Sequence, residues 1–110
     1  MADYDVYAVK KDSDGDITHC YVESVIIQKF STRAEAKTYI KNHCELKTKQ
    51  TVIDDINNMK NNTYTKILKY TDYQYEFELG AKIHVVANRY LRTDANSTTK
   101  DNLDDILEID

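Results

Sequence analysis

Two histidine-cysteine dipeptides are the first residues of this chain whose types could do chemistry. They are His19-Cys20 and His43-Cys44, and two thiols with two imidazoles form a set that Zn²⁺ can bind. Structural zinc sites, however, separate their cysteines by about two to four residues, and adjacent residues on a strand point to opposite faces of a sheet. We therefore expect two buried thiols and two polar histidines, with no disulfide and no metal.

The alternating aspartates Asp12, Asp14 and Asp16 are a second candidate, because a calcium-binding loop begins in this way. An EF-hand loop needs glycine at its sixth position and glutamate at its twelfth, whereas Gly15 is at the fourth. Asp14-Gly15 between two runs of β-branched and aromatic residues is typical of a tight hairpin turn. We predict a structural turn without metal.

No catalytic arrangement stands out in the sequence. Cys20 or Cys44 with His84 could pair a nucleophile with a base, but any chain with two cysteines and three histidines offers such pairs. The chain has no GxSxG, P-loop or GxGxxG motif, and it has only two glycines. The paired carboxylates Asp54-Asp55 and Asp104-Asp105 need not face one substrate. We expect a protein that is not an enzyme and that holds no cofactor.

Tyrosine is the residue type best suited to binding in this chain, which has nine tyrosines, two phenylalanines and no tryptophan. A tyrosine combines a large apolar area with a polar tip, so a sheet face of tyrosines can dock a protein or stack a nucleotide base. About half of them could instead replace phenylalanine in a core, because they alternate with polar residues. The tyrosines on expected strands are Tyr64, Tyr70, Tyr73, Tyr75 and Tyr90.

The charge of the chain is concentrated at its C-terminal end. Residues 94–110 contain six acidic residues and Lys100, a net charge of −5, so the total of −4 leaves +1 for residues 1–93. The acidic segment would repel phosphate backbones, and no basic stripe compensates for it. Nucleic-acid binding is therefore disfavoured.

The length of 110 residues predicts one domain, 1–110. No apolar run approaches the roughly 20 residues that span a bilayer, so no membrane association is expected. The first residues are acidic and lack the apolar core of a signal peptide, which favours a cytoplasmic location.

Hydrophobic periodicity divides the domain into four regions. Residues 4–30 read as a β-hairpin with strands over 4–11 and 17–23, and residues 25–27 are a short buried continuation. Residues 31–62 read as two helices, residues 63–93 as strands, and residues 94–110 as an acidic C-terminal segment. The predicted fold is therefore α+β, with a mainly antiparallel sheet, an N-terminal β-hairpin and two helices inserted before the C-terminal strands.

Local signals refine these regions. Thr32-Arg33-Ala34-Glu35 fits a capping box that opens the first helix, and Val52, Ile53, Ile56 and Met59 form the apolar stripe of a second helix over residues 49–60. Strict alternation from Tyr73 to Leu79 predicts a strand with one buried face, which Gly80 is expected to end.

Two stretches of the chain carry a resemblance to a known family. The first is Tyr7-Ala8-Val9-Lys10-Lys11-Asp12-Ser13-Asp14-Gly15-Asp16-Ile17-Thr18, and the second is Tyr90-Leu91-Arg92-Thr93-Asp94 followed by Asp101-Asn102-Leu103-Asp104-Asp105-Ile106. In these stretches the chain resembles the bacterial and phage family catalogued as domain of unknown function 3892. The family usually has Leu-Pro after the paired aspartates, where this chain has Ile106-Leu107, and residues 45–80 look like an insertion. The resemblance implies no reaction, ligand or catalytic residue.

Single apolar residues in strongly polar surroundings predict that residues 90–107 fold back onto the sheet. Leu91, Leu103 and Ile106 would be superfluous in a disordered tail, because free chains are low in apolar residues. Residues 103–107 could form one helical turn capped by Asp101 or could pin a loop.

Two classes of function remain after these exclusions. The first is a non-enzymatic binding or regulatory module that engages a protein partner, or a second copy of itself, through its tyrosine-rich sheet and acidic tail. The second is a domain for a small ligand, a nucleotide or a metal, with hydrolytic activity as a further option. The candidate binding residues are Tyr73, Tyr75, Tyr90, Arg92, Asp101, Asn102, Asp104 and Asp105.

Overall fold

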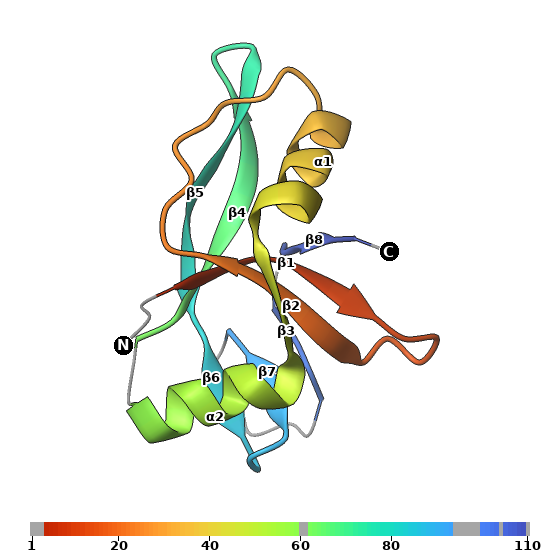
Figure 1. The fold of residues 1–110 in the computed structure, drawn as a ribbon, viewed down its shortest axis with the longest axis vertical. Coiled ribbons are helices and arrows are strands. Elements are labelled where there is room, and N and C mark those ends of the chain that lie inside the picture. Colours follow the sequence, from red (N-terminus) through yellow and green to blue (C-terminus); the bar gives the residue numbers. More distant parts are fainter. Residues whose placement is uncertain (1–3, 60–61, 94–99, 104, 110) are drawn as a thin grey trace.

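The computed structural model describes residues 4–59, 62–93, 100–103 and 105–109 (Figure 1). The chain forms the predicted N-terminal hairpin, then two helices with a short strand between them, and then the C-terminal strands, which confirms the α+β class. In chain order the elements are β1 (Asp5–Lys11), β2 (Ile17–Glu23), α1 (Arg33–His43), β3 (Glu45–Thr48), α2 (Lys49–Met59), β4 (Tyr64–Thr71), β5 (Gln74–Lys82), β6 (His84–Val86), β7 (Tyr90–Arg92) and β8 (Leu107–Glu108).

The main sheet has the strand order β3-β2-β1-β4-β5, and β6 with β7 forms a separate hairpin. Neighbouring strands are antiparallel except along one edge of β1. On that edge β4 runs parallel to β1 at Val6, and β8 runs parallel to it at Ala8 and Val9. The predicted mainly antiparallel sheet is therefore confirmed. The late strand β8 pairs with the first strand, β1.

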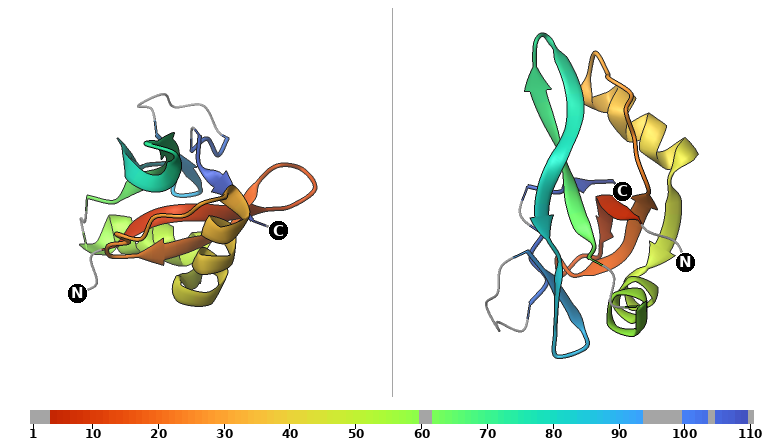
Figure 2. Two further views of the ribbon diagram at one scale, coloured as in Figure 1. Left: turned by 90° about the horizontal axis from the view of Figure 1, so that it is seen from above. Right: turned by 90° about the vertical axis from the view of Figure 1, so that its left-hand side faces the viewer.

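β1 is the centre of the molecule because it contributes to both hydrophobic clusters. Val6, Tyr7, Ala8 and Val9 are all fully buried, and a bulge between Val6 and Ala8 turns Val6 and Val9 into one cluster and Tyr7 and Ala8 into the other. The first cluster includes the apolar face of α2, and the second includes the apolar face of α1. In the right-hand view of Figure 2, both helices lie on one side of the molecule and the β4–β5 hairpin on the other.

The two helices begin as the sequence predicts. The Thr32 hydroxyl accepts the N–H of Glu35, so the threonine cap of the predicted capping box is confirmed. The Glu35 carboxylate accepts the N–H of Ser31, one residue before the N–H that a standard capping box uses. Ala36 and Ile40 are the buried residues of α1. In α2 the Thr48 hydroxyl accepts the N–H of Thr51. Of the predicted apolar stripe, Val52 and Ile53 are buried and Ile56 is partly buried, and the side chain of Met59 lies outside what the structure describes.

Residues 25–27 do not continue the sheet as a buried segment, and that prediction is wrong. The Tyr7 hydroxyl accepts the N–H of Ile26, whose side chain packs into the second cluster. Val25 and Ile27, on either side, point outward and are 65% and 86% exposed. A hydrogen bond to one backbone group therefore buries one residue of the three and leaves its neighbours in solvent.

Gly80 does not end β5, because the strand continues to Lys82. A side chain at position 80 would collide with Thr65, whose hydroxyl group accepts the N–H of Ala81. The glycine therefore permits close approach of two strands within the sheet rather than breaking it.

The C-terminal segment folds back onto the sheet as predicted. Leu91 and Leu103 belong to the first cluster, and Ile106 is partly buried against it. The described part of the segment contains no helical turn. It is held instead by a backbone hydrogen bond from Asn102 N–H to the Leu91 carbonyl and by β8, which sequence reasoning missed because it spans only two residues. Among the described residues, no helix has the length and apolar character needed to cross a membrane.

Candidate functional site

The structure separates the predicted binding residues into two places. Tyr90, Arg92, Asp101 and Asn102 come together where β7 meets the C-terminal segment. Tyr73 and Tyr75 lie at the turn of the β4–β5 hairpin, at the end of the molecule away from α2 (Figure 1). Asp105 lines a pocket beside that hairpin, and Asp104 lies outside the described residues.

Asp101 is turned into the molecule rather than toward a partner. Its side chain is only 1% exposed. One carboxylate oxygen, Oδ2, accepts the N–H of Ile17 at 2.9 Å and a hydrogen bond from Lys49 Nζ at 3.0 Å, and Oδ1 accepts the N–H of Leu91 at 2.9 Å. Three donors compensate the buried charge, so this carboxylate organises the fold.

The neighbours of Asp101 are also occupied by contacts within the chain. Arg92 is buried, and its Nη1 donates to the Lys100 carbonyl at 2.8 Å. The backbone of Asn102 pairs with the residues around β7, accepting the N–H of Thr93 at 2.9 Å. The ammonium group of Lys49 lies 5.6 Å from the ring centroid of Tyr90. This group of residues closes the C-terminal segment over the sheet. With Lys11, Asp14 and Gly15 of the first hairpin, Arg92, Lys100, Asp101 and Asn102 also line a pocket of about 500 Å³.

The two cysteines are unsuited to nucleophilic chemistry. Both are free thiols, and burial raises the pKa of each to about 12, with the negative charge of Asp101 adding to the effect at Cys20 and that of Glu23 at Cys44. A protonated thiol is a poor nucleophile and a poor metal ligand. In the part of the chain that the structure describes, no group of three potential metal ligands includes a cysteine or a histidine.

The aspartates of the first turn do form a group, because their carboxylate oxygens lie within 4.8 Å of one another and all three side chains are exposed. The Asp12 carboxylate already accepts the N–H groups of Asp14 and Asp16, and Gly15 has the positive φ of +84° that the turn requires. The predicted hairpin is therefore confirmed, and the absence of metal stays a prediction.

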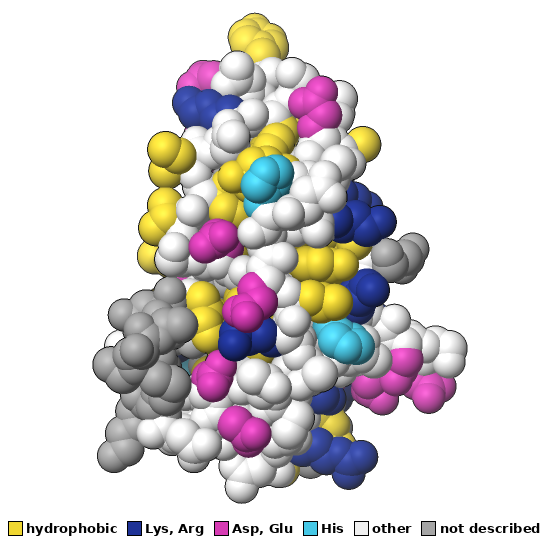
Figure 3. Space-filling view, in the orientation of Figure 1, with side chains coloured by type: hydrophobic (Ala, Val, Ile, Leu, Met, Phe, Trp, Pro, Cys, Tyr) yellow, Lys and Arg dark blue, Asp and Glu magenta, His cyan; other side chains and the backbone are white. Residues whose placement is uncertain are grey.

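Exposed apolar side chains gather instead on the β4–β5 hairpin and the segment beside it. Among the described residues, six large hydrophobic side chains are exposed, and one of these, Leu46, lies on β3 at the other edge of the sheet. Figure 3 shows hydrophobic side chains at the hairpin tip and along the margin where Figure 1 draws residues 24–30 and β5. We call the five exposed hydrophobic residues other than Leu46 the apolar strip: Val25, Ile27, Tyr70, Tyr73 and Leu79.

The tip of the hairpin is built in an unusual way. The turn residues Asp72 and Tyr73 both have positive φ, 52° and 64°, a conformation for which asparagine and glycine are normally chosen. Tyr73 is 89% exposed, whereas Tyr75 is half-buried and exchanges two backbone hydrogen bonds with Phe30. Tyr73 is therefore available to a partner, and Tyr75 anchors the strand.

Sequence reasoning named Tyr73 as a candidate binding residue but placed it on a strand, whereas it lies in the turn between β4 and β5. Tyr70 was not among the candidates, and Leu79, Val25 and Ile27 were expected to be buried. The alternation of β5 is real, but only Tyr75 and Phe77 on that face pack against the second cluster. Leu79 is 64% exposed, because the core ends before the strand does. Three consecutive apolar residues at positions 25–27 were the available signal, since an extended segment cannot bury them all on one face.

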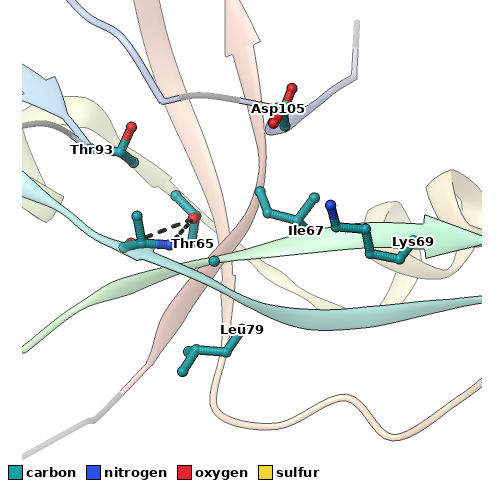
Figure 4. Close-up of a pocket in the computed structure, with 8 residues that line it drawn as sticks. Thr65, Ile67, Lys69, Leu79, Thr93 and Asp105 are labelled. Carbon is teal, nitrogen blue, oxygen red and sulfur yellow. Dashed lines mark hydrogen bonds between the residues drawn. The ribbon is translucent and has the colours of Figure 1, made fainter.

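A small pocket with both polar and apolar lining residues lies beside the same hairpin, and Leu79 of the apolar strip is one of the residues that line it. It has a volume of about 230 Å³, and its lining includes Lys69 from β4 and Asp105 and Thr93 from the C-terminal part of the chain. Figure 4 shows Lys69 of β4 and Asp105 of the C-terminal segment among the residues that line the pocket, together with Leu79 of β5. The Thr65 hydroxyl, which also lines the pocket, accepts a hydrogen bond from the backbone N–H of Ala81.

Comparisons with protein-family models, with curated proteins and with solved structures find no match to this chain.

Proposed function

We propose that this chain is a small protein-binding module and that the apolar strip, formed by the β4–β5 hairpin and the segment before α1, is its contact surface. The proposal depends chiefly on Tyr73, a bulky aromatic residue that is 89% exposed and has a φ of 64°. A side chain other than glycine loses about 1–2 kcal/mol in this conformation, and here no burial compensates for it. A residue that weakens the fold and presents an aromatic ring to solvent fits a role in binding.

The composition of the strip supports a protein partner. Tyrosine is enriched at the centres of protein interfaces, where its ring is buried and its hydroxyl finds a hydrogen-bond partner. The ring of Tyr70 packs against the ring of Tyr75 in a tilted arrangement, with centroids 4.8 Å apart and 58° between the ring planes, which holds one exposed ring in a fixed orientation. Exposed residues that are fixed before binding lose little conformational entropy when they meet a partner.

A photo-crosslinking amino acid at position 73 tests the proposal in cells that encode the chain. We expect a covalent adduct with a defined protein, identified by mass spectrometry, and no adduct from the same group at Leu46, which is exposed on the opposite edge. The purified partner should bind the Tyr73→Ser and Ile27→Ser variants at least tenfold more weakly and the Leu46→Ser variant unchanged. Equal labelling from both positions would refute the proposal.

A small polar ligand is the second candidate, and the pocket in Figure 4 favours it. Lys69 and Asp105 carry opposite charges at its rim, which suits a zwitterion such as a free amino acid. Calorimetric titration with the common amino acids should then show binding that Lys69→Ala abolishes and that Lys41→Ala, at an exposed residue of α1 outside the pocket, leaves unchanged. If none of the amino acids gives a heat of binding, the small-ligand function is eliminated.

Membership of the family catalogued as domain of unknown function 3892 also stays a proposal. The two resembling stretches meet in space, because Asp101 of the second accepts the N–H of Ile17 in the first. Residues that build one contact are expected to recur together among relatives. A structure of a family member in which the corresponding aspartate is exposed would argue against the assignment.

A further inference from the structure

The outer edge of β5 is largely unpaired in the described part of the chain. β5 ends the sheet order β3-β2-β1-β4-β5, so it bonds to β4 on one side only. On its outer side, Tyr75 exchanges hydrogen bonds of 2.8 and 2.7 Å with Phe30, and the described residues make no other backbone hydrogen bond to that edge. An open strand edge is a template for another strand.

The turn determines which groups of β5 face outward. Asp72 and Tyr73 form a two-residue loop, so Thr71 and Gln74 close the hairpin with a hydrogen-bonded pair. Pairs then alternate along an antiparallel ladder. The N–H and C=O groups of Tyr75, Phe77 and Leu79 therefore point away from β4, which agrees with the bonds from Tyr75 to Phe30.

The contact with Phe30 shows that this edge already accepts extended backbone. A single residue of the chain's own 24–30 segment occupies the end of the edge nearest the turn, and Lys29 lies 3.7 Å from Glu76 in the same contact. A basic side chain thus already sits beside an acidic residue of β5. The outward N–H and C=O groups of Phe77 and Leu79 continue the same row, and none of the described residues pairs with them through backbone hydrogen bonds.

Charge and hydrophobicity specify the segment that would extend this row. Glu76 and Glu78 lie on one face of β5, and the Phe77 and Leu79 side chains lie on the other. A strand added at the edge places alternate side chains beside each face, so basic residues would meet the glutamates and apolar residues would meet Leu79.

We propose that the partner contributes an extended segment of alternating basic and apolar residues, which adds to the outer edge of β5 as a further strand. This inference rests on the proposed function, because it names the chemistry of the partner that the apolar strip would contact.

The test uses the fluorescently labelled probe peptide acetyl-Lys-Val-Arg-Ile-Lys-Val-Arg-amide with the intact chain. We expect saturable binding by fluorescence anisotropy at low salt. Two control peptides should bind at least tenfold more weakly. One replaces each basic residue with glutamate, and the other carries N-methyl groups on the backbone nitrogens along one edge. Equal affinity for the N-methylated peptide overturns strand addition without requiring any variant to fold.

A matched pair of variants separates backbone from side chain at the edge. Leu79→Pro removes the outward N–H, whereas Leu79→Ala keeps that group and removes most of the exposed side chain. Leu79→Pro should bind the probe at least tenfold more weakly than Leu79→Ala, with both variants folded by circular dichroism. Glu78→Lys should weaken binding by a similar factor.

The outcomes distinguish this inference from the proposed function. If the probe binds Leu79→Pro as well as it binds Leu79→Ala, strand addition is wrong, but the crosslink from position 73 can still identify a partner. If no partner crosslinks at position 73, the proposed function fails whatever the peptide does. A dimer seen by sedimentation and lost in Leu79→Pro would assign the edge to a second copy of the chain and overturn the peptide as its occupant.

Discussion

The carboxylate of Asp101 lies 3.0 Å from the ammonium group of Lys49, the first residue of α2, although the two residues are 52 positions apart. The same carboxylate accepts the backbone N–H of Ile17, where β2 begins, and that of Leu91 in β7. One side chain thus joins the N-terminal hairpin, a helix and the C-terminal strands. The acidic character of the C-terminal segment has a structural purpose at this residue.

Asp101→Asn should lower the free energy of unfolding by about 3 kcal/mol, because an amide group would face a buried donor and the Lys49 charge would lose its partner. Denaturant unfolding followed by circular dichroism measures this change. Asp105→Asn is the matched control, since Asp105 is exposed and asparagine tolerates its φ of 58°, so its effect should stay within about 0.5 kcal/mol. Equal effects of the two substitutions would show that the buried contacts do not matter.

Leu103→Ala should destabilise the whole domain by about 2–5 kcal/mol, because the side chain is only 6% exposed within the first cluster. Leu79→Ala removes the same atoms from a side chain that is 64% exposed and should have little effect. A truncation after Thr93 removes Asp101, Leu103 and β8 together, so it should lower the melting temperature well below that of either variant. A truncated chain that melts with the intact protein would mean that the segment is merely appended.

Gly80→Ala should cost about 1–3 kcal/mol, because the added methyl group would lie 2.9 Å from both the Thr65 carbonyl oxygen and Ile67 Cγ1, atoms that belong to a packed sheet. Gly15→Ala meets no atom within 4 Å, so only its positive φ penalises it, by about 1–2 kcal/mol. Thermal unfolding compares the two. In a Thr65→Ala background, which removes the hydroxyl group that the added methyl would meet, Gly80→Ala should cost less, but the collisions with the Thr65 carbonyl oxygen and Ile67 remain, so part of the loss should persist.

The stability of the protein should fall as the pH rises from about 9 to about 12. Cys20 and Cys44 ionise near pH 9 when exposed, but burial raises the pKa of each to about 12 in the folded protein. In this window the unfolded chain releases protons that the folded chain retains, so rising pH favours unfolding. Chemical denaturation at a series of pH values should show that the free energy of unfolding falls less steeply with rising pH in Cys20→Ala than in the unaltered protein. An unchanged pH dependence would indicate that the thiol is not responsible.

The first turn should bind no calcium with micromolar affinity, because the Asp12 carboxylate already accepts two backbone N–H groups. Asp12→Ala should therefore weaken the hairpin by about 1 kcal/mol in calcium-free buffer, as loss of a turn or cap hydrogen bond does. Calorimetric titration with Ca²⁺ checks the first statement and denaturant unfolding the second. Micromolar binding that Asp12→Ala abolishes would instead identify a cation site.

Local patterns in the sequence determined most of the secondary structure. The Asp14-Gly15 turn, the capping box at Thr32 and the apolar stripe of α2 depend on residues within one turn or one helix. Their physical causes, a positive φ, an unpaired N–H and a period of about 3.6 residues, act over short separations. The prediction that Leu91 and Leu103 pack onto the sheet also holds, since isolated apolar residues in a polar segment have few other uses.

Only the tertiary structure decided which of these residues face solvent. The Tyr7 hydroxyl, far from residues 25–27 in the sequence, selects Ile26 for burial and leaves Ile27 exposed. Asp101 and Asp105 are the same residue type four positions apart, yet one is enclosed by donors from three distant elements and the other lies in water. Such contacts arise when strands meet across the fold, and the exposed edge of β5 exists only because of where the sheet ends. A one-dimensional pattern contains the preference of each residue for burial but not the geometry that satisfies it.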